Sequence, residues 1–498
     1  KSMNFKNDEF YASMGNRKSQ GGKLMYQNVR KQNEEIRELM NEFSAKMVGF
    51  YNDLHTKPVG RPVEKETWEH LEHQQIPENG RPLKEVYEEM QRDIYSNILL
   101  AQHPRSFSCV PSTASLLSWM GDVMTNAYNP HASCKINAPT ADLVEKKLIR
   151  WMCDRAGYCE EAGGLFVSGG SIANLTAMTA ARDTKLTEDQ RSNAVVYLSD
   201  QTHVSAAKGL HMIGFGKNQI RIIAADEEFR MDMDALKEAV AQDLQAGRKP
   251  FAVIASAGTT NTGSVDPMKE IAALCREYDM WMHVDGAFGA SALLSGQYRK
   301  KLDGIELSDS LSWDAHKWMM QTYGCSVVLV QNQDALVRSF AAHPEYLKDA
   351  ETSEDNVEFW DLGPELTRPA RGLKLWLTLQ TLGSRGLGNV IDHGCGLAEL
   401  AEQILIEEKE WEIISRAQLG IINFRFKGNG TKTEQELDVM NQEIARIVTE
   451  SGFAQVFTTK LKGKKVLRMC TINPETREKD IRDTIERLIE TAGKVQNY

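Results

Sequence analysis

The middle of the chain alternates short apolar runs with longer amphipathic stretches. The runs GLFVS, AVVYLS, IRIIAA and FAVIASA are each followed by a stretch with apolar residues at helical spacing, and WMHVD, SLSWD and CSVVLV come after them. Apolar strands that alternate with helices are typical of a mostly parallel sheet covered on both faces. The pattern therefore predicts an α/β fold, in which ligands bind at the carboxyl ends of the strands.

The two ends of the chain have different patterns. Residues 1–30 are polar, and helical periodicity dominates from about residue 31 to 100. Towards the C-terminus the pattern predicts a helix at 388–408, the strand GIINFRF, a helix from EQEL to TES, the strands QVFTTKL and KVLRMCTI, and a final helix. We therefore predict three parts, which are an N-terminal helical arm at 1–105, a large domain at 106–385 and a small C-terminal α+β domain at 386–498.

Composition narrows the class of protein. The chain has 498 residues, of which 69 are acidic and 59 basic, and its net charge is −10. This acidic balance argues against nucleic-acid binding, and no apolar run approaches the roughly 18 residues of a membrane span. The first residues lack the apolar core of a signal peptide, and the eight cysteines contain no CxxC pair. We therefore expect a cytoplasmic protein with reduced thiols, and the lack of HxxxH or HExxH pairs predicts no metal site.

Two residues after neighbouring predicted strands can carry chemistry together. Lys317, in SWDAHKW, lies just past an apolar strand, and a partly desolvated lysine can form a Schiff base with a carbonyl. Asp285 ends the strand WMHV and could pair with a cationic ring nitrogen. Taken alone, a lysine at the position of Lys317 is more often a surface residue, and an aspartate at the position of Asp285 is more often a helix cap. A lysine and an acid at successive strand ends are what pyridoxal phosphate (PLP) chemistry requires.

Other polar residues follow the same strands. VSGGS, at 167–171, combines a strand, a glycine pair and a helix start, which suits a phosphate group, although a plain glycine turn is the alternative. His203 and His316 could stack on a flat ring, act as an acid or base, or simply be satisfied loop residues. The acidic stretch 342–361 is long enough for a lid, so Tyr346 within it could donate a proton or remain an exposed loop residue.

In combination these segments resemble the group II PLP-dependent decarboxylases, and within them the bacterial aromatic amino acid enzymes of the tryptophan decarboxylase type. The resemblance rests on the order of HPRSFSCVPS, GLFVSGGSIANLTAMTAARD, YLSDQTHVSAAKGL, SAGTTNTGSVDP, HVDGAFGAS, DAHKW, PEYLKD and WDLGPELTRPARGLKLW. It implies a fold-type I PLP-dependent transferase fold with a mostly parallel seven-stranded sheet. It also implies PLP as the cofactor and a homodimer with the site at the subunit interface.

The resemblance further implies roles for single residues. Four residues would be catalytic. Lys317 would attach the cofactor, and Asp285 would pair with its pyridine nitrogen. His203 would stack on the ring, and Tyr346 would protonate the carbon that loses CO2. The other cofactor contacts would be Gly170, Ser171, Ser256, Ala287, His316 and Thr367. The substrate contacts would be Cys109, His131, Asn137, Leu347, Trp360 and Leu366. Leu366 and Thr367 are expected to serve the neighbouring subunit.

The chain also departs from the family pattern. Ser106 and Cys109 stand where relatives often carry aromatic residues, and Asn137 stands where an apolar residue is usual, so we expect a wider and more polar substrate pocket. Asp314 replaces the asparagine of the animal enzymes, and no role is carried over to it because an acid would repel a phosphate.

The expected reaction is decarboxylation of an aromatic L-amino acid to the amine and CO2. Tryptophan is the first choice, giving tryptamine, and phenylalanine or tyrosine is possible. Another decarboxylase, for example of glutamate, is the alternative, but it needs a cationic clamp, and the sequence does not place Arg368 or Arg371 in the pocket. An aromatic aldehyde synthase is a further alternative, which Tyr346 disfavours because aldehyde-forming relatives tend to carry Phe there.

Overall fold

The computed structural model describes residues 31–110, 114–341 and 357–496. The chain divides into two compact units at residues 99 and 100, and each is described by itself. The described part of the first unit is helical, as its periodicity predicts. It holds a helix over residues 31–52, α2 (Lys65–His73), α3 (Leu83–Glu89) and short turns up to Asn97.

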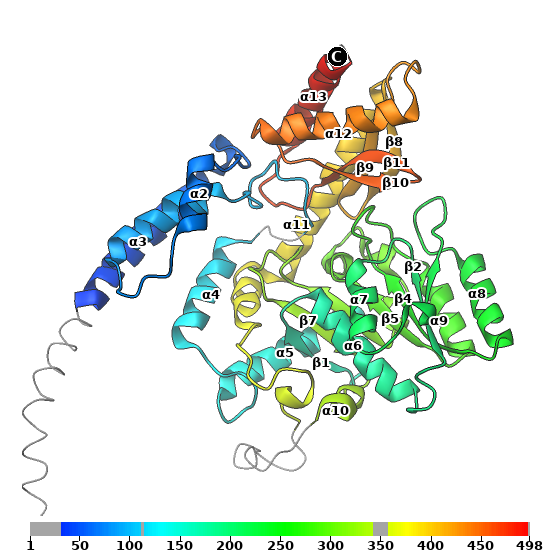
Figure 1. Cartoon of the computed structure of the whole chain (residues 1–498). Coiled ribbons are helices and arrows are strands. Elements are labelled where there is room, and N and C mark those ends of the chain that lie inside the picture. Colours follow the sequence, from blue (N-terminus) through cyan, green and yellow to red (C-terminus); the bar gives the residue numbers. More distant parts are fainter. Residues whose placement is uncertain (1–30, 111–113, 342–356, 497–498) are drawn as a thin grey trace, which may run out of the picture. The chain divides into compact units, whose positions relative to one another are not determined.

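A seven-stranded sheet occupies the centre of the second unit (Figure 1). Its order is β1-β7-β6-β5-β4-β2-β3, with parallel pairing from β6 through to β3 and antiparallel pairing of β7 with both of its neighbours. The predicted mostly parallel sheet of seven strands is therefore confirmed. The strands are β1 (Gly163–Val167), β2 (Ala194–Ser199), β3 (Ile220–Ile223), β4 (Lys249–Ser256), β5 (Trp281–Asp285), β6 (Ser310–Asp314) and β7 (Ser326–Val330).

Helices cover both faces of this sheet. Every residue of β5, β6 and β7 is buried, which requires cover on both sides because successive side chains point to opposite faces. Parallel neighbours also need crossover connections, and helices supply them. The helices around the sheet are α4 (Leu116–Tyr128), α5 (Pro139–Ala156), α6 (Gly170–Lys185), α7 (Val204–Met212), α8 (Met233–Gln245), α9 (Met268–Glu277) and α10 (Asp334–Phe340).

A second sheet, near the C-terminus, has four antiparallel strands in the order β10-β11-β9-β8. Its elements are α11 (Leu373–Glu407), β8 (Trp411–Gln418), β9 (Ile421–Phe426), α12 (Glu434–Glu450), β10 (Phe457–Leu461), β11 (Lys464–Cys470) and α13 (Glu478–Val495). Two sequence predictions were incomplete here. β8 was missed, because its partly buried residues do not alternate cleanly, and α11 begins at Leu373 rather than at residue 388.

Within α11 the backbone leaves the helical region at Gly383, where φ is 69° and ψ is 164°. A positive φ is one that glycine adopts at little cost, so Gly383 bends the helix between the two sheets. The boundary expected at residue 386 lies just after this kink, and the division into a large and a small domain stays a prediction.

The segment that ends at residue 110 forms backbone hydrogen bonds with the smaller sheet and the loop before it. The backbone of Phe107 donates to the carbonyl of Gln455 at 2.9 Å and accepts from Cys470 N–H at 2.8 Å. The Phe107 side chain is fully buried in the core of the smaller sheet. Cys109, two residues later, is therefore held by this sheet although it is far away in sequence. No helix in the described part of the chain is long and apolar enough to cross a membrane.

Candidate active site

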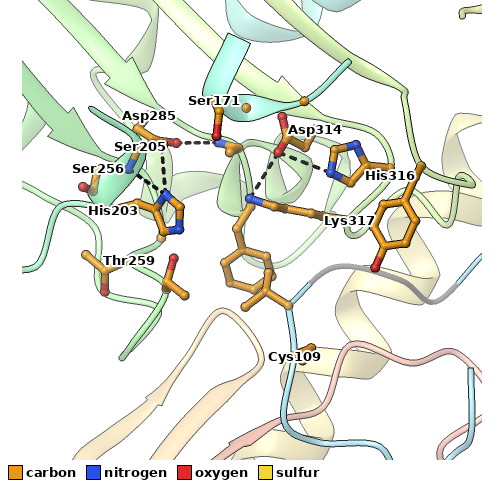
Figure 2. A pocket seen from close by; sticks show the side chains of 18 of the residues that line it. Cys109, Ser171, His203, Ser205, Ser256, Thr259, Asp285, Asp314, His316 and Lys317 are labelled. Atoms are coloured by element: carbon orange, nitrogen blue, oxygen red, sulfur yellow. Dashed lines mark hydrogen bonds and ion pairs between the residues drawn. The ribbon is translucent and has the colours of Figure 1, made fainter. Parts of the chain in front are cut away.

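A cavity of about 450 Å³ lies at the carboxyl ends of the larger sheet (Figure 2). The ends of β1, β2, β4, β5 and β6 all point to this edge, because β1 and β6 are each antiparallel to the β7 strand between them. Nine of the predicted site residues line the cavity, namely Cys109, Gly170, Ser171, His203, Ser256, Asp285, Ala287, His316 and Lys317. These residues, which are far apart in the sequence, therefore lie together at one edge of the sheet.

Lys317 lies three residues after the end of β6 and reaches into this cavity. Its Nζ atom is 3.2 Å from Oδ2 of Asp314, and the same oxygen is 3.7 Å from Nε2 of His316, so two groups face one carboxylate (Figure 2). Nδ1 of the His316 ring forms a hydrogen bond with the hydroxyl of Ser326 at 3.1 Å. Burial lowers the pKa of His316 below its usual value. Asp314, for which no role was predicted, is therefore the partner of the predicted reactive amine.

Asp285 is buried at the end of β5, and its carboxylate is well supplied with donors. Oδ2 accepts from Asn174 at 2.9 Å, and Oδ1 accepts from the backbone of Ala287 at 3.1 Å and from Ser312 at 3.3 Å. Burial opposes its ionisation, but the charge of Lys317 and the Asn174 amide outweigh it, so the pKa of Asp285 is lowered. The cavity therefore contains a buried carboxylate that is ionised at neutral pH.

His203 caps the N-terminus of α7. Its Nδ1 atom lies 2.8 Å from the hydroxyl of Ser205 and accepts from the Ser205 backbone N–H at 3.3 Å. The opposite edge of the ring, which carries Nε2, faces the cavity that His203 lines (Figure 2). Both readings of the sequence thus hold in part, since His203 is a satisfied capping residue and also a wall of the cavity.

The start of α6 forms another wall. Gly170 is so closely packed that a Cβ atom there would lie 2.8 Å from Oδ2 of Asp314 and 3.1 Å from Cβ of Ala287. The first backbone N–H groups of a helix have no partner within it and carry partial positive charge. Gly170 and Ser171 line the cavity at this point, so the wall suits an anion.

The wall opposite comes partly from the smaller sheet. Arg468, on β11, donates from Nη2 to the carbonyl of Ser108 at 2.9 Å, and both line the cavity beside Cys109. Within the described residues, Nε of Arg468 is buried without a hydrogen-bond partner. Arg468 was not predicted as a site residue, because it lies about 150 residues after Lys317 in a different predicted domain. Thr259, Phe288 and Tyr323, which also line the cavity, were likewise not singled out.

Five predicted residues lie outside the lining of this cavity. His131 and Asn137 contact each other, Nδ1 to Nδ2 at 3.0 Å, and Trp360 is buried with its backbone N–H donating to Ser133. Leu366 and Thr367 are exposed, as a role towards a second subunit would require. Their contacts with substrate or cofactor stay predictions, and Tyr346 and Leu347 lie outside the described residues.

The two arginines considered as clamps for an acidic substrate are both engaged elsewhere. Arg368 is fully buried and pairs with Glu145 at 2.7 Å. Arg371 makes a two-pronged contact with Glu365, with both N–O distances 2.9 Å. Neither lines the cavity in the described part of the chain.

Comparison with known proteins identifies the family. A family model described as the pyridoxal-dependent decarboxylase conserved domain matches residues 65–427. The chain belongs to this family. This decarboxylase is 38% identical to the aromatic-L-amino-acid decarboxylase of Bacillus atrophaeus over 473 residues, which cover 95% of the chain and 97% of that relative.

Two solved structures are similar to this decarboxylase over nearly their whole length. The crystal structure of Oryza sativa TDC with PLP and tryptamine gives a TM-score of 0.88 at 26% identity and covers 93% of this chain and 98% of that one. Catharanthus roseus tryptophan decarboxylase in complex with L-tryptophan gives 0.86 at 26% identity, with the same coverage. The fold-type I architecture, PLP as the cofactor and amino acid decarboxylation, all predicted from the sequence, are confirmed.

Proposed function

We propose that the decarboxylase acts on aromatic L-amino acids, with tryptophan as its first substrate, giving tryptamine and CO2. Phenylalanine and tyrosine are the next candidates. The named activity of the Bacillus relative and the tryptophan bound to the Catharanthus enzyme support this choice.

The residues of the cavity fit PLP. The cofactor carries an aldehyde, a pyridine nitrogen and a phosphate, and the cavity offers the Lys317 amine, the Asp285 carboxylate and the N-terminus of α6. Gly170 leaves room where a Cβ atom would meet Asp314, so the helix start can approach an anion closely. Ser256, Ala287 and His316 are the further contacts proposed for the cofactor.

When bound, PLP supplies an electron sink for the electron pair left behind by the departing CO2. Asp285 keeps a proton on the pyridine nitrogen, because an ionised carboxylate in a buried site stabilises a neighbouring cation. Lys317 would hold the cofactor through its amine. His203 and Ala287 hold the flat ring in place, and Tyr346 delivers a proton to the carbon that has lost CO2.

The charges on the cavity wall are the observation that favours aromatic over acidic amino acids as substrates. Among the described lining residues, Arg468 is the only permanent cation besides Lys317. Once the Lys317 amine holds the cofactor, Arg468 remains to pair with the carboxylate that every amino acid has. A glutamate substrate would bring a second carboxylate into a wall that offers no second cation. An uncharged ring can instead lie against Phe288 and Tyr323.

A homodimer is part of the same proposal. Helix α4 exposes Met120, Met124 and Tyr128, and Leu366 is also exposed. Clustered apolar side chains on a surface mark interaction sites, and a second copy of the chain would cover them. Light scattering of the holoenzyme should give twice the 56.0 kDa chain mass, and a fully active monomer would contradict the proposal. A cytoplasmic location is also proposed, supported by eight cysteines that are all free thiols.

The test of function is an amine-release assay of the purified holoenzyme across all twenty amino acids, with Lys317→Ala as the inactive control. We expect the highest kcat/KM for tryptophan, followed by the other aromatic amino acids. Turnover of glutamate with none of the aromatic amino acids would overturn the proposal.

A further inference from the structure

Behind the cavity, six side chains form one continuous hydrogen-bond chain. It begins at the indole of Trp281, which donates to the hydroxyl of Ser310 at 2.8 Å. Ser310 contacts Nδ1 of His283 at 2.8 Å, and Nε2 of His283 contacts Oδ1 of Asn174 at 2.9 Å. The Asn174 amide then donates to Ser205 at 3.2 Å, and Ser205 contacts Nδ1 of His203.

Two groups with only one hydrogen-bonding role fix the direction of this chain. An indole N–H can only donate, so Ser310 accepts from Trp281 and keeps its own proton available for His283 Nδ1. An ionised carboxylate can only accept, so the nitrogen of the Asn174 amide must be the atom that faces Asp285 at 2.9 Å. The Asn174 oxygen then faces His283, which must donate from Nε2. A neutral His283 therefore has no proton on Nδ1, and this nitrogen accepts from the Ser310 hydroxyl.

The direction continues to the cavity. Because Asn174 donates to the Ser205 oxygen, the Ser205 hydroxyl proton is free to point at His203 Nδ1. The backbone N–H of Ser205 also points at this nitrogen, at 3.3 Å, and it too can only donate. The proton of a neutral His203 ring therefore sits on Nε2, on the cavity side.

We propose that Asn174 is a positioning residue whose amide acts on two groups of the site at once. It donates to Asp285 and so keeps this carboxylate an acceptor. Through Ser205 it also keeps His203 a donor towards the bound ligand. The tautomers of His203 and His283 follow from the contacts alone, whereas a role of these tautomers in catalysis rests on the proposed function. Trp281, Ser310 and His283 form the buried end of this relay, whose direction is fixed at Asn174 by the Asp285 carboxylate.

The burial of the relay agrees with its direction. Asn174 is 1% exposed and His283 and Ser310 are fully buried, so bulk water does not compete for these bonds. Burial lowers the pKa of His283 to about 4, which keeps the ring neutral at pH 7 and leaves one nitrogen without a proton. A protonated His283 would place an N–H against the Ser310 oxygen and reverse the direction of the contact between these two residues.

The larger sheet offers a matched control. Trp313 donates from its indole to the hydroxyl of Ser291 at 3.0 Å, and both Ser291 and Ser310 are fully buried. Ser310→Ala and Ser291→Ala each remove one hydroxyl that accepts from a tryptophan. Only the first of them cuts the relay.

The test reads the histidine tautomers by ¹⁵N NMR in the full-length chain labelled with ¹⁵N-histidine, with and without PLP. Signals are assigned with His203→Gln and His283→Gln. We expect both rings to carry the proton on Nε2, Ser310→Ala to shift the signals of His283, and Ser291→Ala to shift neither histidine. A wild-type His203 or His283 that carries its proton on Nδ1 would overturn the relay.

Asn174→Ala supplies a second readout, which is the Kd for PLP. Asp285 loses a hydrogen bond to its charged form, so we expect PLP to bind about tenfold to a hundredfold more weakly, with the His203 signal shifted and that of His283 Nδ1 retained. An unchanged Kd and an unchanged His203 signal would contradict the role of Asn174. The NMR result does not depend on which amino acid is decarboxylated, so failure of the relay and failure of the proposed substrate are distinguishable.

Discussion

Lowering the pH from about 7.5 to about 5 should destabilise the larger sheet through His283. With its pKa at about 4 in the folded chain and about 6.5 unfolded, the ring is neutral in both states at the higher pH. Between these two values only the unfolded chain binds the proton, so stability is lost as the pH falls. At pH 5 the difference in proton binding corresponds to about 2 kcal/mol of unfolding free energy.

Hydrogen exchange of the β5 amides measures this effect where it arises, because slow amides in a core strand report the unfolding of that strand. His283→Gln is the control, since glutamine can form hydrogen bonds but does not titrate. The substitution lowers the free energy of unfolding by the same amount at both pH values, so its own effect cancels in the difference between them. We expect the wild type to lose about 2 kcal/mol more than the variant between the two pH values. An equal loss in the two proteins would refute the neutral, buried His283.

Four further predictions concern the site. Lys317→Ala should remove the yellow colour of the holoenzyme and all turnover, and decarboxylation that persists would contradict its role as the cofactor amine. Asp285→Asn should weaken PLP binding by about tenfold to a hundredfold in a titration, because a charge-assisted hydrogen bond contributes about 1.5–3 kcal/mol. Tyr346→Phe should lower amine formation and raise aldehyde, measured by product analysis, and an unchanged product ratio would rule out Tyr346 as the proton donor. Arg468→Met should raise KM for tryptophan at least tenfold while PLP affinity stays unchanged, because the substrate carboxylate loses its cation.

The order of strands and helices around the cofactor cavity was predictable because each element carries its own pattern. Strands β5 and β6 are buried along their whole length, Asp285 is the last residue of β5, and Lys317 lies three residues after the end of β6. Since parallel strands present their carboxyl ends at one edge, the meeting of these two residues followed from local signals alone. The partly buried β8 strand has no such uniform pattern and was missed.

Long-range contacts were not predictable in the same way. Asn174 looks like an ordinary helical residue in SIANLTAM, and His283 looks like part of an apolar strand, so nothing local indicates that they are 2.9 Å apart. Arg468 reaches the cavity from another sheet. The ion pair between Lys317 and Asp314 depends on a turn geometry that the letters DAHK do not reveal.

The cavity draws its walls from two sheets. The groups proposed for the cofactor stand at the strand ends of the larger sheet, whereas Cys109 and Arg468 are attached to the smaller one through Phe107 and β11. New substrates can therefore be explored, by natural drift or in a directed library, through mutations that leave the reaction machinery untouched. If Cys109 and Arg468 contact the substrate as proposed, variation at the smaller sheet would change what the enzyme accepts while the chemistry that it performs is inherited unaltered.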